Sequence, residues 1–172
     1  MDKKEFMIFV NGLRTYYPRE NILPSVESVE LWFRQLEDIP FKTAETVLHR
    51  WVATNRWSPT IADIREGATE LTSEPIPDWG EAWGQVMRAV RLYGSYEPEK
   101  AYELMGEPTA TCVKRIGWNE ICFAESIDNV IANFRMIYEA ESAKRKREAQ
   151  VSPAVRDRIG SVHLKAIDEV IE

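Results

Sequence analysis

The sequence contains few of the residues from which enzymes build reactive centres. Only two cysteines and two histidines occur among its 172 residues. Cys112 and Cys122 lie in apolar surroundings at a spacing that matches no metal motif and no disulfide framework, which favours a reducing compartment. His49 and His163 show no arrangement typical of a metal site or a catalytic triad. We therefore expect no metal and no catalytic nucleophile.

Glycine is also sparse, and its placement excludes the common nucleotide-binding loops. The eight glycines occur singly, none is followed by lysine, and none forms a GxGxxG pattern. A phosphate-binding loop needs clustered glycines and a lysine to surround the phosphates. The sequence therefore predicts a non-enzymatic protein that uses no cofactor.

Long hydrophobic runs are missing as well. No stretch approaches the roughly 20 apolar residues that a membrane-spanning helix requires. The N-terminal residues alternate between apolar and polar instead of forming the apolar core of a secretory signal, so we expect a cytoplasmic protein without a membrane anchor. The net charge of -6 disfavours extensive contact with nucleic acid, because such contact depends on many basic side chains. Proteins are the partners that this composition favours.

The residues that are abundant predict helices throughout. Helix-capping residues and apolar stripes at helical spacing recur along the chain, whereas extended β-branched runs do not occur. The sequence predicts an all-α fold of two small helical bundles joined by a Pro-rich linker, with a long C-terminal helix and an amphipathic tail helix. We expect an N-terminal domain at residues 1–72, the linker at 73–77, the second helical domain at 78–149 and the tail at 150–172.

The tail is the main candidate for a partner-binding site. It follows a charged spacer and carries five apolar residues on one helical face, namely Val155, Ile159, Val162, Ala166 and Val170. Helices that dock into a groove of another protein use anchors at this spacing. Packing on the chain itself, on a second copy or on a partner would each bury this face, and the sequence does not choose among them.

Two further features are candidates for secondary contacts. Trp57 and Trp118 lie at expected helix junctions, where we expect partial exposure. The other four tryptophans fall on apolar stripes and are assigned to the core: Trp32, Trp51, Trp79 and Trp83. Exposed tryptophans would instead suit stacking on single-stranded nucleic acid.

A basic cluster in the charged spacer is the other candidate. It consists of Lys144, Arg145, Lys146 and Arg147, which could contact phosphate. Glu139, Glu141 and Glu148 flank the cluster and weaken its field, so a solvated helix face is the favoured interpretation.

Several short segments stand out as motifs. In the first part of the chain they are the Tyr-Tyr-Pro turn at residues 16–18, the helix around Trp51 and the helix restart at residues 57–65. These segments resemble the helicase loader and inhibitor proteins of tailed phages that infect Gram-positive bacteria. A second block is similar to longer members of that family, at residues 82–86, 93–94, 116–118 and 134–138.

The resemblance implies an adaptor that binds the replicative hexameric helicase and restrains its activity. It also implies help in delivering the helicase to a phage origin marked by an initiator, which would be a second partner. The family's helicase contact is ascribed to a flexible C-terminal region, which corresponds here to the segment around residues 155–171. The lack of a nucleotide-binding loop agrees with the resemblance.

The alternative interpretation is a DNA-binding protein of phage replication or regulation. It would use the fourth expected helix, which begins after Thr60, or the basic cluster at residues 144–147. Steeply salt-dependent DNA binding would distinguish it from the adaptor.

Overall fold

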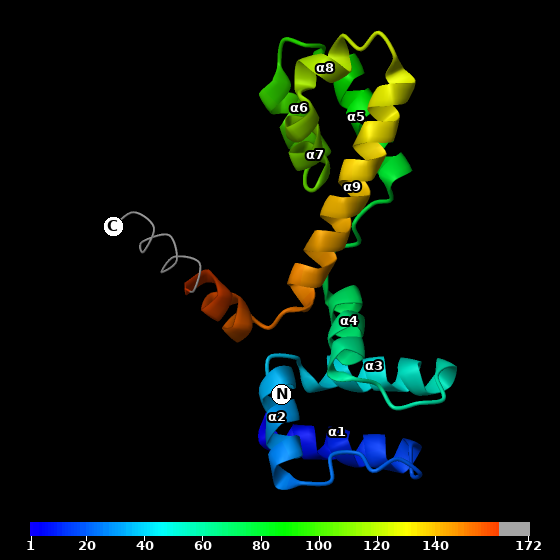
Figure 1. Ribbon diagram of the computed structural model, residues 1–172, viewed down its shortest axis with the longest axis vertical. Coiled ribbons are helices and arrows are strands. Elements are labelled where there is room, and N and C mark those ends of the chain that lie inside the picture. The colour runs from blue at the N-terminus through cyan, green and yellow to red at the C-terminus, as the bar shows by residue number, and fades with distance from the viewer. Residues whose placement is uncertain (162–172) are drawn as a thin grey trace. The chain divides into compact units, whose positions relative to one another are not determined.

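The computed structural model describes residues 1–161, and these residues are helical without any strand (Figure 1). This confirms the expected all-α class. Among these residues, no helix combines the length and apolarity that crossing a membrane would require. The chain divides into a first unit, formed by residues 1–74 with 148–161, and a second unit, formed by residues 75–147. The domain division expected from the sequence stays a prediction.

Four helices build most of the first unit, and side-chain caps define where they begin. They are α1 (Lys3–Tyr16), α2 (Val26–Leu36), α3 (Phe41–Thr54) and α4 (Ile61–Thr72). The Asp2 carboxylate accepts hydrogen bonds from the first-turn backbone of α1, and the Glu5 carboxylate accepts one from the Asp2 N–H. Thr60 and Asp63 form the same reciprocal cap on α4. These caps satisfy N–H groups that have no partner within the helix.

The core of the first unit is built from the apolar stripe of each helix. Its fully covered side chains include Phe6, Val10, Leu13, Leu36, Ala44 and Ile64. The buried face of α4 does not extend to Leu71, although Leu71 lies three residues after the buried Ala68. Leu71 is 47% exposed, whereas the charged Arg65 is only 9% exposed. Arg65 can be buried because polar partners surround its guanidinium group.

The second unit contains five helices in chain order. They are α5 (Trp79–Tyr93), α6 (Pro98–Met105), α7 (Thr109–Ile116), α8 (Trp118–Cys122) and α9 (Ile127–Gln150), of which the last residues belong to the first unit. Phe134 and Tyr138 of α9 are buried, and the Phe134 ring packs against Trp83 of α5 with centroids 5.2 Å apart. The Tyr138 hydroxyl donates to the Pro77 carbonyl at 2.9 Å, which ties the start of the unit to α9.

Two helical glycines give opposite predictions for the same substitution. A Cβ on Gly67 of α4 would lie 2.7 Å from Cγ1 of Val47 on α3, whereas a Cβ on Gly84 of α5 would meet nothing within 4 Å. We expect Gly67→Ala to destabilise the protein by about 1 kcal/mol, because the overlap with a stiff valine outweighs the gain in helix propensity. Gly84→Ala should stabilise it by about 0.5–1 kcal/mol. Urea unfolding of both variants checks the signs, and a stabilising Gly67→Ala would contradict the close contact of α3 and α4.

Candidate partner-binding site

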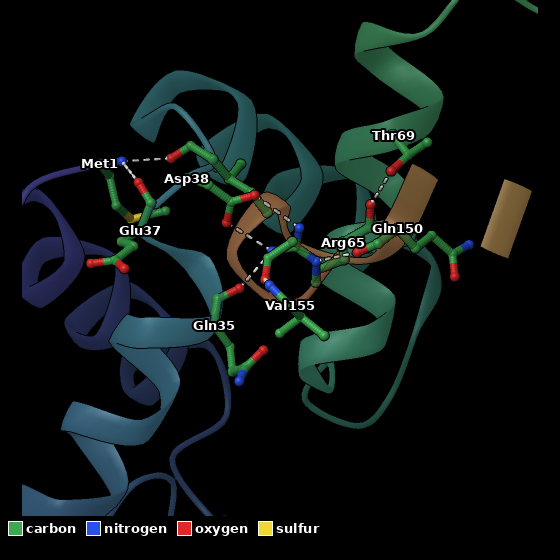
Figure 2. A network of polar contacts seen from close by, with 10 residues as sticks. Met1, Gln35, Glu37, Asp38, Arg65, Thr69, Gln150 and Val155 are labelled. Carbon is green, nitrogen blue, oxygen red and sulfur yellow. Dashed lines mark hydrogen bonds and ion pairs between the residues drawn. The ribbon is translucent and has the colours of Figure 1, made fainter. Parts of the chain in front are cut away.

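The Arg65 side chain of α4 holds together segments of the first unit that are far apart in sequence (Figure 2). Its two terminal nitrogens donate to the two carboxylate oxygens of Asp38, each at 2.9 Å. One of them also donates to the Gln35 carbonyl at 2.6 Å, and Nε donates to the Gln150 carbonyl. A guanidinium with planar, forked donors can satisfy all of these acceptors at once. We call this set of four residues the Arg65 clamp.

Electrostatics favour the charged form of Asp38 in the clamp. Hydrogen bonding to the Arg65 guanidinium holds the pKa of Asp38 below its ordinary value, although partial burial acts in the opposite direction. The chain's N-terminal ammonium group secures the same loop from another side, since it donates to the Glu37 carbonyl and, at 2.8 Å, to the Ile39 carbonyl. The loop after α2 is therefore fixed at its backbone and at its side chain.

The clamp lies at the base of the tail. Two residues after Gln150, Ser152 is 6% exposed, and its carbonyl accepts hydrogen bonds from the backbone N–H groups of Val155 and Arg156 at 3.1 and 3.0 Å. These bonds begin a helical segment that covers residues 153–161. The base of the predicted binding segment is thus attached to the first unit.

Two of the five apolar residues predicted for the tail lie within the described structure, and they differ in exposure. Val155 is half-buried near the base, and Ile159 is 49% exposed one helical turn later. Val162, Ala166 and Val170 lie outside the described residues. Within the described part of the tail, Ile159 is therefore a large apolar side chain available to another surface.

Trp57 is the most exposed tryptophan on the described surface, at 74%. Its loop is nevertheless well anchored. The Glu20 carboxylate accepts hydrogen bonds from the backbone N–H and the hydroxyl of Ser58, at 3.1 and 2.6 Å. The Trp57 carbonyl accepts a third from the Trp51 indole at 2.9 Å. A large aromatic ring on a preorganised loop has the properties of a binding hot spot, because little conformational freedom remains to be lost on binding.

Trp118 is not the partly exposed contact expected from the sequence. It is 5% exposed, and its indole N–H donates to the Gly94 carbonyl at 3.0 Å. The short helix α8 turns this ring inward against the second unit's core, so Trp118 is removed from the binding candidates. The tryptophans assigned to the core are half-buried: Trp32, Trp51, Trp79 and Trp83.

The basic cluster at residues 144–147 is partly neutralised within the second unit. Arg145 donates to the Glu107 carboxylate at 2.7 Å and to Glu141 at 3.1 Å. Its side chain is 34% exposed, less than expected for a solvated helix face. A phosphate would have to compete with two carboxylates for this guanidinium.

The cysteines have the character of core residues. Burial raises the pKa of the Cys112 thiol to about 11 and raises that of Cys122 as well. Both thiols are therefore protonated at neutral pH, which makes them poor nucleophiles. Within residues 1–161, no group of three or more His, Cys, Asp or Glu side chains is arranged to hold a metal ion.

Sequence reasoning missed the Arg65 clamp, although one signal for it existed. Arg65 lies four residues after Ile61 and three before Ala68, so it interrupts the apolar face of α4 with a charge. A charge at such a position needs a buried partner. Nothing local indicated Asp38 or the Gln150 carbonyl, which is 85 residues away.

Comparison with known proteins identifies the first part of the chain. Residues 1–65 match the family model for the N-terminal domain of the helicase loader and inhibitor of phage SPP1. Among curated proteins and among solved structures, no match to this chain is found. The matched residues include the α1–α3 helices, the Trp57 loop and Arg65, but not the second block of resembling segments. The first 65 residues are therefore similar to the N-terminal domain of that phage helicase loader and inhibitor, which confirms the resemblance inferred from the sequence for this part of the chain.

Proposed function

We propose that this protein is a non-enzymatic adaptor that binds the replicative hexameric helicase, restrains its activity and helps load it at a phage replication origin. The match of residues 1–65 to the N-terminal domain of the phage loader is the observation that carries this proposal. An initiator bound at the origin would be the second partner. The site of action would be the cytoplasm of a bacterial host.

The tail and the Trp57 loop supply the proposed helicase contacts. Ile159 and Trp57 are exposed, whereas hydrogen bonds attach the base of the tail and the backbone of the Trp57 loop to the first unit. Anchored backbones with exposed apolar side chains favour binding, because fewer degrees of freedom are lost in the complex. The remaining tail residues of the apolar face, Val162, Ala166 and Val170, would extend the same contact.

The adaptor would act through differential affinity. A protein without a nucleotide-driven step can restrain a helicase only by binding one of its conformations more tightly than another. Coupling of this kind is typically about 1–3 kcal/mol, which corresponds to roughly 5–150-fold in affinity. Restraint of the ATPase and delivery of the helicase would then use one interface.

DNA binding, the alternative role, has weaker support. Arg65 is the single basic residue of α4, and it is buried in the clamp. In the cluster at residues 144–147, Arg145 is engaged by Glu107 and Glu141. The surface of α4 is thus short of available basic charge, and one of the four cations of the cluster is already neutralised.

The test measures binding to the purified replicative helicase of the phage, or to that of the host if the phage encodes none. We expect a complex with a changed ATPase rate, and about tenfold weaker binding for Ile159→Glu or Trp57→Ala, as is usual for hot-spot residues. Ile8→Glu is the matched control, because Ile8 is 60% exposed on α1 of the same unit and belongs to neither contact. Absence of both a complex and a rate change would refute the adaptor role. A mobility shift of DNA at low salt would favour the alternative.

A further inference from the structure

The corner between α8 and α9 exposes a large aromatic side chain that lies outside the core of the second unit. Phe123, directly after α8, is 71% exposed, whereas Trp118 and Ile121 within α8 are 5% and 4% exposed. The Phe123 N–H donates to the Asn119 carbonyl at 3.0 Å, which fixes its backbone at the end of the helix. Ile127, at the start of α9, is 40% exposed. The corner therefore presents an apolar surface on an ordered backbone.

A surface hollow of about 540 Å³ lies at this corner. Phe123, Ala124 and Val130 give it apolar walls, and Asn119, Ser126 and Asn129 add neutral polar groups. The remaining lining residues, Glu120 and Glu125, are acidic. Figure 1 shows the α8–α9 turn at one end of the second unit. We call Phe123, Ile127 and the residues lining this hollow the corner patch.

The charged residues within the segment that forms the corner patch have one sign. Residues 116–134 include Glu120, Glu125 and Asp128 but no lysine or arginine. None of these three carboxylates takes part in an ion pair within the described structure. Glu120 and Asp128 lie in first helical turns, where the helix dipole favours them. Even so, Glu120 and Glu125 line the same hollow as the exposed Phe123, and residues 116–134 supply no compensating cation.

We propose that the corner patch docks a basic amphipathic helix of a partner protein, with an apolar anchor against Phe123 and cationic side chains facing the carboxylates. Charge complementarity selects this occupant, because negative potential attracts lysine and arginine and repels nucleic acid phosphates. An exposed aromatic ring beside a hollow can become the desolvated centre of an interface when a partner covers it. The patch lies outside the residues that match the phage loader domain, so the inference does not rest on the helicase proposal.

The test uses the full-length protein and a fluorescent, helix-forming synthetic peptide with Leu on one face and Lys on the other. In a second peptide, Glu replaces Lys. Fluorescence anisotropy at 50 and 200 mM NaCl measures both dissociation constants. We expect binding of the basic peptide alone, weakened by salt, and weakened about tenfold by Phe123→Ser and about threefold by Glu125→Gln. The two substitutions affect exposed side chains, and circular dichroism verifies that the helices persist.

Two matched controls separate docking at the corner patch from general attraction to an acidic protein. Met136→Ser removes another exposed apolar side chain of α9, which is 66% exposed, and Glu81→Gln removes one charge from the first turn of α5. Both should leave the affinity unchanged. The proposal is overturned if the peptide fails to bind, or if Phe123→Ser and Met136→Ser bind it equally well. It is also overturned if sedimentation shows a dimer that Phe123→Ser abolishes, since a second copy would then be the occupant.

Discussion

Replacing Phe134 with alanine is expected to destabilise the second unit by about 3–5 kcal/mol, the usual cost of deleting a buried aromatic ring. The ring is fully buried, and its centroid lies 5.2 Å from Trp83 and 5.5 Å from Tyr138. Removing it leaves a cavity between α5 and α9 that these large neighbours cannot fill without moving. Thermal unfolding and hydrogen exchange of individual segments measure the effect.

The same variant tests the proposed domain division. If the units fold independently, amides in α5–α9 up to residue 147 lose protection in Phe134→Ala, while those of α1–α4 keep it. Met136→Ala, two residues along the same helix at a side chain 66% exposed, serves as the control and should change stability by less than about 0.5 kcal/mol. Loss of protection throughout both units would mean that the division is wrong.

Replacing Arg65 with methionine should cost the first unit about 3 kcal/mol, because breaking a largely buried pair leaves the remaining charge and acceptors partly out of water. The substitution keeps an apolar stem of similar length but leaves Asp38 without its cation. It also leaves the Gln35 and Gln150 carbonyls without this donor. Urea unfolding with a probe in α1–α4 measures the loss.

Arg50→Met is the matched control for that prediction. Arg50 forms an ion pair with Glu70 at 3.0 Å between α3 and α4, but the two side chains are 64% and 53% exposed. Pairs of this kind contribute roughly 0–1 kcal/mol, because water solvates both charges well. Equal losses in the two variants would show that the Arg65 clamp has no special weight in the fold.

The contribution of the clamp should also depend on pH in a defined direction. The pKa of Asp38 is lowered in the folded protein from an ordinary value of 3.8, so folding favours the ionised carboxylate. The resulting stabilisation is fully present above that ordinary value and is lost as the pH falls through the lowered folded-state pKa. The difference in stability between the natural protein and Arg65→Met should therefore narrow below about pH 4. A constant difference down to about pH 2 would contradict the role of Asp38.

Much of the fold follows from local signals in the sequence. Asp2, Thr60 and Asp78 cap helices that begin at the next residue, and each is recognised by its side chain and by the acidic residue three positions later. The stripe of Phe6, Val10 and Leu13 is buried as its spacing indicates. Such features can be predicted because they depend on neighbours within one or two helical turns.

The candidate sites are a different case, because they depend on contacts between distant segments. Trp57 and Trp118 have similar positions at helix junctions, yet one is 74% exposed and the other 5%. The Gly94 carbonyl, 24 residues from Trp118, accepts a hydrogen bond from that indole and holds the ring inward. The Trp57 ring remains exposed, because the hydrogen bond from the Trp51 indole goes to the backbone carbonyl of Trp57 and not to its ring.

The amino-acid sequence by itself determined the helices, their caps and their apolar faces, since each of these rests on local spacing. Its short motifs also carry the resemblance to a helicase loader. Tertiary structure alone decided that Arg65 is buried, that the base of the tail is attached to the first unit, and that Phe123 remains outside. Burial of a charge depends on which distant acceptors surround it, and exposure of a ring depends on whether the core is already filled. Neither quantity is encoded in the spacing of residues along one helix.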